Sequence, residues 1–209
     1  MRKADDVLMV SFNEKSKKSY NSKADNYENT LDGKFTRRFK QLLAEMIELE
    51  EAQNVLDFGC GNGYLLSLLN ERKPINGFGI DVADRMIKNA KSRNPGMEFH
   101  VSGCESTPFH DCSMDVLTVC AAYHHFPDTN AFAKEAARLI KPNGKIYIAE
   151  VYFSSFLRKV CNPFIPLSKA GDVRFYSPDE IVNEFSRFGF EKIDIAIFGH
   201  IQIVSMRFR

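Results

Sequence analysis

A glycine-rich stretch at residues 57–63 is the strongest chemical signal in the sequence. It reads Asp-Phe-Gly-Cys-Gly-Asn-Gly and overlaps the end of a short apolar segment at 54–58. Glycine lets a backbone turn sharply and approach a ligand without a Cβ in the way. A helix that begins behind such a turn offers free N–H groups and a favourable dipole to a carboxylate or hydroxyl. The stretch therefore predicts a ligand-binding loop.

Asp81 follows about twenty residues after this loop, at the end of the next apolar segment. A carboxylate at the tip of a second strand can accept two hydrogen bonds from the hydroxyls of a ribose. The loop spacing is Gly-x-Gly-x-Gly, which differs from the Gly-x-Gly-x-x-Gly loop that cradles a pyrophosphate. A glycine loop alone is often only a turn. The strand, the helix and the acid together favour a nucleoside ligand.

Three polar side chains, Tyr123, His124 and His125, follow the apolar segment 115–121. We expect them at the carboxyl end of its strand, beside Glu150 at the end of the next strand. An imidazole titrates near neutral pH, so these residues are candidates for accepting a proton during catalysis. The alternative is that the histidines shape the ligand pocket or pack the following helix.

The remaining histidines and the five cysteines suggest no further chemistry. The cysteines are odd in number and lack CxxC spacing, which predicts free thiols in a reducing compartment. Cys60 and Cys120 are interpreted as small packing residues. No partners at metal-ligand spacing accompany the other histidines, so no metal site is predicted; these histidines are His100, His110 and His200.

Charge and hydropathy exclude several classes of partner. The chain carries 28 Lys and Arg against 27 Asp and Glu, a net charge of +1, so no field of one sign attracts a polyanion. The first apolar run, 7–10, is too short for a signal peptide, and no stretch is long enough to span a membrane. The sequence therefore predicts a cytoplasmic protein with no nucleic-acid partner.

Apolar periodicity predicts a single α/β domain over residues 1–209, with strands and helices alternating from residue 54 onward. The chain ends with two strands separated only by Gly199 and its neighbours, which leaves no room for a crossover helix, so they must be antiparallel. We therefore expect a Rossmann-like, mostly parallel seven-stranded sheet with helices on both faces and a C-terminal antiparallel hairpin. The predicted strands are 54–58, 77–80, 97–101, 115–121, 145–151, 190–198 and 200–207. The predicted helices are 37–51, 64–70, 84–91 (with Asp84 as N-cap), 130–140 and 178–188.

Two segments lie outside this alternation and are candidates for covering a ligand. Residues 1–35 form a polar N-terminal cap segment that carries Tyr20 and Tyr27. Residues 152–176 are rich in aromatic and branched side chains, and long loops of this kind usually act as lids. We expect this second segment to be a lid that contacts an acceptor. The alternative is an added helix packed on the sheet edge.

Five motifs resemble those of class I S-adenosylmethionine-dependent methyltransferases. The acidic-x-Gly-x-Gly-x-Gly loop at 57–63 is similar to the first motif of the family, and 79–86 resembles the second. The stretches 102–109, 123–128 and 139–145 resemble the adenine loop, the His-His-x-Pro-Asp tail and the Leu-Lys-Pro-Gly-Gly turn. The match is strong over about half of the chain. The nearest subgroup is the small-molecule type that includes ubiquinone/menaquinone and sterol C-methyltransferases.

The resemblance implies S-adenosyl-L-methionine as the cofactor and a small molecule as the methyl acceptor. One departure is that Gly103 stands where the family usually has the Asp of the adenine loop, so Glu105 is a candidate substitute. Asp57 takes an orienting role near the methionine amino group by resemblance, or a capping role in the loop. The predicted cofactor-binding residues are Tyr20, Asp57, Gly59, Cys60, Gly61, Gly63, Asp81, Val82, Met86, Gly103, Cys104, Glu105 and Cys120.

Two rival functions remain open at this point. A nicotinamide-dependent oxidoreductase also has a glycine loop and a ribose acid, but the loop spacing and the terminal hairpin count against it. The second rival function is that of a non-catalytic relative, which binds the cofactor without transferring a methyl group. The acceptor, the methylated atom and the oligomeric state do not follow from the sequence, because fold and cofactor do not determine a substrate.

Overall fold

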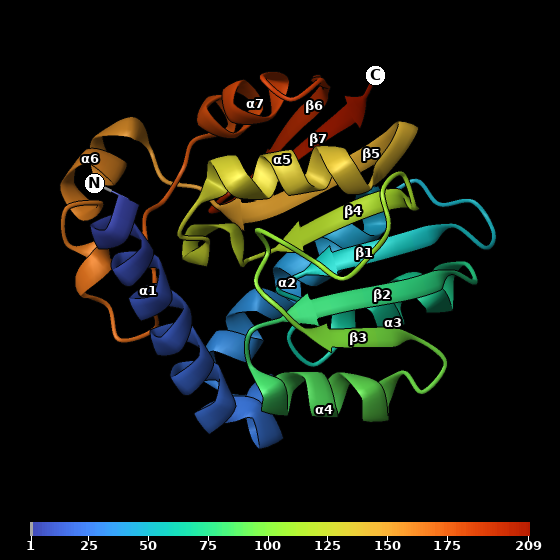
Figure 1. Ribbon diagram of the computed structural model, residues 1–209, viewed down its shortest axis with the longest axis horizontal. Coiled ribbons are helices and arrows are strands. Elements are labelled where there is room, and N and C mark those ends of the chain that lie inside the picture. The colour runs from blue at the N-terminus through green and yellow to red at the C-terminus, as the bar shows by residue number, and fades with distance from the viewer. Residues whose placement is uncertain (1) are drawn as a thin grey trace.

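A seven-stranded sheet in the order β3-β2-β1-β4-β5-β7-β6 forms the centre of the structure, a computed structural model that describes residues 2–209, with side chains from Ser11 onward (Figure 1). The neighbouring pairs among β1 to β5 are parallel, whereas β7 is antiparallel to both β5 and β6. This confirms the predicted fold class, including the terminal hairpin. The strands are β1 (Asn54–Phe58), β2 (Asn76–Asp81), β3 (Glu98–Val101), β4 (Met114–Cys120), β5 (Ile140–Val151), β6 (Phe190–Phe198) and β7 (Ile201–Phe208).

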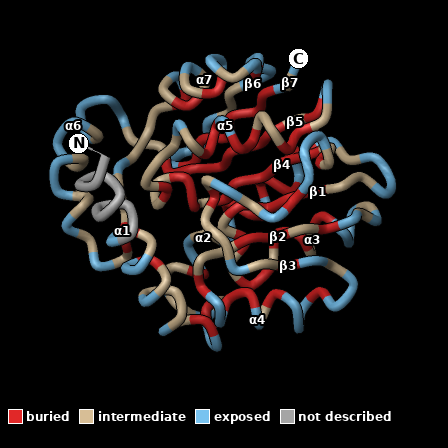
Figure 2. Tube along the Cα trace, viewed as in Figure 1, coloured by how far each residue is buried: buried red, intermediate tan, exposed pale blue. Residues whose placement is uncertain are grey.

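Helices cover both faces of the sheet and bury its central strands (Figures 1 and 2). On one face α5 (Thr129–Leu139) and α7 (Pro178–Ser186) pack against side chains such as Phe58. On the other face α2 (Leu31–Met46), α3 (Tyr64–Arg72) and α4 (Asp84–Arg93) pack against alternate residues such as Val55. Because β1 is apolar toward both faces, it is buried between the two helix layers.

Several element boundaries differ from those predicted. The first predicted helix begins earlier, at Leu31, because the Thr30 side chain caps it by accepting a hydrogen bond from the Gly33 N–H at 3.0 Å. Asp84 is the first residue of α4 and does not cap it, since the N-cap position is Ala83. Strand β5 begins at Ile140, directly after α5, and contains the predicted Lys-Pro-Asn-Gly turn with a register shift against β4.

The segments outside the alternation contain helices, of which the one within 152–176 was the alternative prediction for that segment. Helix α1 (Arg2–Lys23) and the 3₁₀ turn η1 (Ala24–Asn29) make up most of the predicted cap segment, of which residue 1 and the side chains before residue 11 lie outside the described part. Helix α6 (Ser155–Cys161) and the 3₁₀ turn η3 (Ile165–Leu167) lie within 152–176. The Ser16 hydroxyl donates a hydrogen bond to the Ala170 carbonyl at 3.1 Å, which joins the two segments.

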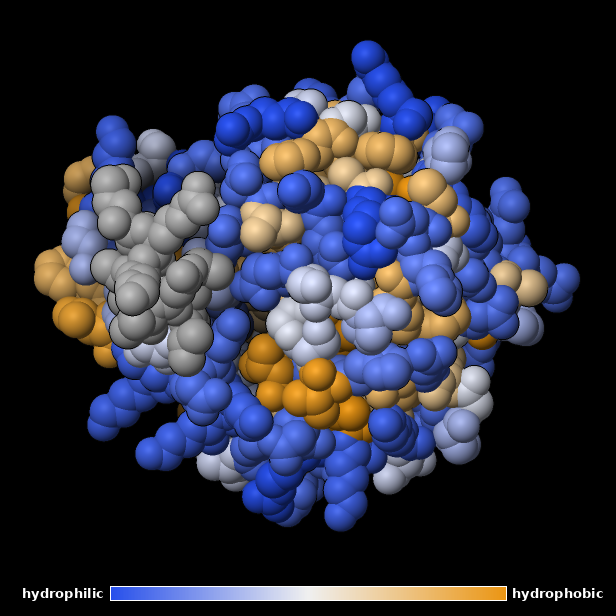
Figure 3. All heavy atoms as spheres, viewed as in Figure 1, coloured by the Kyte–Doolittle hydropathy of each residue, from blue (hydrophilic) through white to orange (hydrophobic). Residues whose placement is uncertain are grey.

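Helix α6 and its neighbours present apolar side chains to the surface, at the left edge of the molecule in Figure 3. Phe156 and Leu167 are 76% and 78% exposed, and Phe164 is 67% exposed. In the part of the chain that the structure describes, however, no helix combines the length and hydropathy needed to cross a membrane.

Candidate cofactor and active site

The loop between β1 and α3 adopts a conformation that requires glycine. Gly59, Gly61 and Gly63 have φ values of +67°, +53° and +74°, a region that other residues rarely adopt. A Cβ at Gly59 would also lie 2.7 Å from the Cβ of Ala122, which follows β4, whereas a Cβ at Gly61 would meet no atom within 4 Å. The loop is thus packed behind Gly59 and open in front of Gly61, where it leaves room for a ligand.

Asp81 ties this loop to the end of β2. Its carboxylate accepts hydrogen bonds from the N–H of Gly61 at 2.9 Å and from the N–H of Ala83 at 2.8 Å. Burial raises the pKa of Asp81, while these two N–H donors lower it. Parallel strands β1 and β2 end at the same edge of the sheet, and this register brings residues twenty apart into contact.

A pocket of about 770 Å³, including its mouth, lies at the edge of the sheet above this loop. Nine of the thirteen predicted cofactor-binding residues line it. The nine residues are Tyr20, Gly59, Cys60, Gly61, Asp81, Val82, Met86, Cys104 and Cys120.

Asp57 is not among the residues that line the pocket. It is 2% exposed and accepts a hydrogen bond from the Thr118 hydroxyl, on the adjacent strand β4, at 2.7 Å. Burial raises the pKa of Asp57 to about 7, against a lowering effect of the Thr118 hydrogen bond and of Lys40. Its role near the methionine amino group stays a prediction from resemblance, because the side chain is buried beside that of Thr118.

The other predicted residues outside the pocket lining are Gly63, Gly103 and Glu105. Gly63 is the N-cap of α3 and lies at the point where the loop enters that helix. The Glu105 side chain folds back toward Gly103: a Cβ at Gly103 would lie 2.6 Å from Glu105 Oε2. The other oxygen, Oε1, is buried without a hydrogen-bond partner, and burial raises the pKa of this carboxyl group.

Lys40 on α2 is a pocket residue that the sequence did not single out. Its Nζ lies 5.2 Å from the centre of the Tyr27 ring and 5.6 Å from that of Tyr64, and the residue is only 8% exposed. The sequence feature that could have indicated this pocket residue is a basic side chain among apolar ones, between Phe39 and Leu42. Tyr27, which was expected to cover the ligand, also lines the pocket, and the remaining lining residues that were not predicted are Asn13, Ser16, Thr36, Ile80, Ser102, Ala121, Ala122 and Phe126.

The three predicted proton acceptors occupy different environments on the 3₁₀ turn η2 (Tyr123–His125). Tyr123 is fully buried in the apolar core beneath α5 and α7, and its ring packs against Tyr176 and Phe132, so it does not reach the pocket. His124 does not line the pocket either. Only His125 does, and its Nε2 lies 2.9 Å from the Tyr20 hydroxyl on α1.

Acidic groups surround the two histidines. His124 Nδ1 lies 2.8 Å from Glu150 Oε2, and Asp172 Oδ1 lies 3.5 Å from His124 Nε2 and 3.2 Å from His125 Nδ1. Burial lowers the pKa of His124, but Glu150 and Asp172 outweigh it and raise that pKa overall. Burial and the neighbouring His124 lower the pKa of His125 to about 4.

Asp172 is a member of this cluster that the sequence analysis missed. It belongs to the segment 152–176, and the Val173 N–H donates to the His124 carbonyl at 2.7 Å, which holds the segment beside η2. No residue of 152–176 is among those that line the pocket, so the contact that the structure shows for this segment is with the histidines, and its role as a lid stays a prediction. Sequence spacing gives no signal for such a long-range contact.

The sheet order, the glycine loop and Asp81 together define a Rossmann-like nucleoside-binding domain of the methyltransferase type. A family model described as "Methyltransferase domain" matches residues 56–148. The chain belongs to the class I S-adenosylmethionine-dependent methyltransferases, with S-adenosylmethionine as the cofactor. The nicotinamide oxidoreductase alternative is set aside, because β7 is inserted antiparallel where a dinucleotide-binding sheet continues in parallel.

Within this class the chain is distantly homologous to quinone-pathway enzymes. It is 28% identical over 183 residues to the demethylmenaquinone methyltransferase of Thermotoga maritima, covering 77% of this chain and 78% of that protein. It is 30% identical over 130 residues to the ubiquinone/menaquinone biosynthesis C-methyltransferase UbiE of Rickettsia felis, covering 54% and 52%.

A solved structure shares the fold over nearly the whole chain. It is a putative methyltransferase in complex with the Trm112 methyltransferase activator of Haloferax volcanii, with a TM-score of 0.79 and 19% identity, covering 90% of this chain and 96% of that one. Likeness at this level of identity concerns the fold alone.

Proposed function

We propose that this methyltransferase transfers the methyl group to a small, largely apolar acceptor by in-line displacement. The leaving group of a sulfonium is a neutral thioether, so the protein needs no general acid. Alignment of the acceptor atom, methyl carbon and sulfur can lower the barrier by about 7–11 kcal/mol. The main requirement is therefore a pocket that holds the acceptor in one orientation against the cofactor.

The distribution of polar groups supports an orientation for the cofactor. Asp81, with Val82 and Met86, lies at the end where a ribose and adenine would bind, because the Asp81 carboxylate is the ribose acceptor in such folds. Lys40 is the basic side chain among the lining residues, and it can pair with the carboxylate of the methionine tail. The sulfonium would then lie between them, near Gly59.

The observation that carries the acceptor proposal is the position of α1 over the pocket. Tyr20 and Ser16 of α1 line the pocket together with His125 and Phe126, and Tyr20 is in contact with His125, so the acceptor space is partly aromatic. A polynucleotide or a folded protein would have to displace this helix. The relatives in quinone pathways support a ring-bearing acceptor. We also propose a cytoplasmic setting, which five free cysteines support.

A radiolabelled transfer assay tests the proposal. The protein is incubated with methyl-labelled S-adenosylmethionine and one of three acceptors: a short-chain demethylmenaquinol, phosphoethanolamine or unmodified transfer RNA. We expect label only in the quinol-type product. Label in transfer RNA, or in phosphoethanolamine alone, would contradict an apolar ring acceptor.

Glu105 is proposed to replace the missing Asp of the adenine loop. Its carboxylate lies beside the position that a Gly103 side chain would take, and its Oε1 has no partner. A small rotation would let this oxygen accept a hydrogen bond from the adenine amino group. We expect Glu105→Gln to weaken S-adenosylhomocysteine binding about 10-fold, measured by calorimetry, with little change for S-inosylhomocysteine, which lacks that amino group. Equal losses for both ligands would assign Glu105 a structural role.

A further inference from the structure

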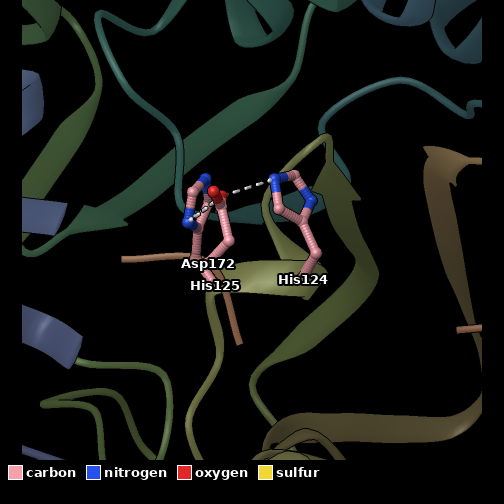
Figure 4. A group of neighbouring side chains, drawn as sticks. All are labelled: His124, His125 and Asp172. Carbon is pink, nitrogen blue, oxygen red and sulfur yellow. Dashed lines mark ion pairs between the residues drawn. The ribbon is translucent and has the colours of Figure 1, made fainter. Parts of the chain in front are cut away.

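Three potential ligand atoms converge beside the pocket, from His124, His125 and Asp172 (Figure 4). They are His124 Nε2, His125 Nδ1 and one carboxylate oxygen of Asp172, and all three lie within 4.8 Å of one another. The side chains are nearly buried, with exposures of 12%, 10% and 18%. Neither the fold nor transfer from S-adenosylmethionine requires such a cluster.

We propose that His124, His125 and Asp172 bind a divalent first-row transition-metal ion. With metal–nitrogen and metal–oxygen bonds of about 2.0–2.2 Å, neighbouring ligand atoms in tetrahedral or octahedral sites lie about 2.8–3.6 Å apart. The distances from Asp172 Oδ1 to the two nitrogens, 3.2 and 3.5 Å, lie within this range. The two ring nitrogens lie within 4.8 Å of each other, and rotation of the imidazole rings would bring them to the separation that an ion requires.

The remaining ring nitrogens are held by other partners, as is usual for metal-bound histidines. His124 Nδ1 faces the buried Glu150 carboxylate at 2.8 Å, and His125 Nε2 faces the Tyr20 hydroxyl at 2.9 Å. Each contact fixes its ring and leaves the other nitrogen directed into the cluster. His125 Nδ1 is buried without a hydrogen-bond partner, although Asp172 lies near it, so its lone pair is available to an ion.

The charge balance of the cluster also favours a cation. Glu150 and Asp172 bring two carboxylates to a nearly buried site, where Asp172 faces both imidazoles and Glu150 faces the His124 ring and accepts from the backbone N–H groups of His124 and Val151. Among the side chains described, no Lys or Arg forms an ion pair with either carboxylate. Two imidazoles and a carboxylate suit Zn²⁺ or Fe²⁺ better than Mg²⁺ or Ca²⁺, which prefer oxygen ligands alone.

An ion at this position would border the acceptor end of the pocket through His125, and this part of the inference rests on the proposed function. Three protein ligands leave at least one coordination position for an oxygen of the acceptor, whose pKa the ion would lower. Ligation through Nδ1 uses the lone pair with which a neutral imidazole accepts a proton. His125 then acts as a ligand rather than as the predicted general base, and the acceptor proton passes to solvent.

Metal titration of the chelator-treated, untagged full chain tests the site. Zn²⁺ is titrated by calorimetry, and Co²⁺ is followed through its visible d–d absorption, a signature of ligation. We expect one ion per chain, and a loss of affinity greater than 100-fold in Asp172→Asn and His125→Asn, against about 10–100-fold in the supporting variant Glu150→Gln. His100→Asn is the control, since His100 is a half-exposed histidine that pairs only with Glu98.

Absence of stoichiometric Zn²⁺ binding to the native chain would overturn the inference, and so would affinity unchanged in Asp172→Asn. Equal losses in His100→Asn would assign the signal to surface histidines. Titration of each variant with S-adenosylhomocysteine checks that the fold and the cofactor pocket are intact. Zn²⁺ binding is measured without an acceptor, so the two proposals are tested separately. The chain can fail to bind Zn²⁺ and still transfer a methyl group, or bind Zn²⁺ and transfer none.

Discussion

The two sides of the pocket are built in different ways. On the cofactor side the contacts join neighbouring strand ends, such as the hydrogen bond between Gly61 and Asp81, which are 20 residues apart. On the acceptor side they join distant parts of the chain: Tyr20 meets His125 across 105 residues, and Ser16 meets Ala170 across 154. The cofactor side therefore depends on the register of the sheet, whereas the acceptor side depends on the docking of two helical segments.

This difference separates the part of the molecule that defines its chemistry from the part that selects its substrate. Sheet register is rigid and specified by short sequence motifs. Docked segments have fewer buried contacts, so they open more readily and can be replaced without disturbing the sheet. The comparison predicts that changes on the cofactor side abolish binding, and that changes on the acceptor side alter dynamics and turnover.

The largest expected effect is that Gly61→Val abolishes cofactor binding. A branched residue at φ +53° strains the loop, and its side chain would enter the open space in front of Gly61. We expect affinity for S-adenosylhomocysteine to fall at least about 100-fold, or about 2.7 kcal/mol, by calorimetry. Gly96→Ala, at an exposed glycine with free space around it, should bind normally. Retained binding in Gly61→Val would mean that the loop does not contact the cofactor.

Asp57 should make the stability of the cofactor side depend on pH. Its pKa is about 7 in the folded chain against an ordinary 3.8, so between these pH values the folded state holds more protons than the unfolded state. The free energy of unfolding therefore decreases as pH rises from about 4 to 7, by up to about 4 kcal/mol. Asp57→Asn keeps an acceptor for Thr118 and should remove this decrease, as measured by urea unfolding at pH 5 and pH 8. A slope that persists in the variant would assign the effect to other groups.

A smaller effect is expected on the acceptor side, from Gly171→Ala. Gly171 has a φ of +82°, and a Cβ there would lie 2.7 Å from the Phe12 carbonyl oxygen and 2.8 Å from the Ser16 nitrogen, so it would push α1 away. We expect cleavage by a non-specific protease to accelerate about 10-fold at α1, with less than a 10-fold change in cofactor affinity. Gly199→Ala is the matched control, because its φ is also positive but its surroundings are empty. Similar cleavage of both variants would show that backbone strain alone is responsible.

Sequence reasoning predicted the cofactor side well because its signals are local. The strand at 54–58 and the hairpin strand at 190–198 were given by apolar runs with glycine turns, and both have the predicted bounds. The antiparallel pairing followed from a connection too short for a helix. Glu105 was a candidate because Gly103 stands where the resembling motif has an Asp. The Glu105 side chain does fold toward Gly103.

The acceptor side was predicted less well, since its signals are not local. Helix α1 is polar over most of its length, so apolar periodicity did not reveal it. Tyr123 looked like a candidate base, but the 3₁₀ turn directs it into the core while His125 faces the pocket. Asp172 could not be associated with the histidines, because only the docking of 152–176 brings it there.

The hydrogen bond from Ser16 to Ala170 has a consequence for how two ligands bind to the protein. A ligand that orders α1 lowers the cost of ordering the segment 152–176, so two ligands that each use one segment strengthen the binding of the other by the same factor. S-adenosylhomocysteine in the pocket lined by Tyr20 of α1, and the ion proposed at Asp172 of the segment 152–176, would then each bind more tightly in the presence of the other. An equal factor of improvement in both dissociation constants is the behaviour that this single contact implies.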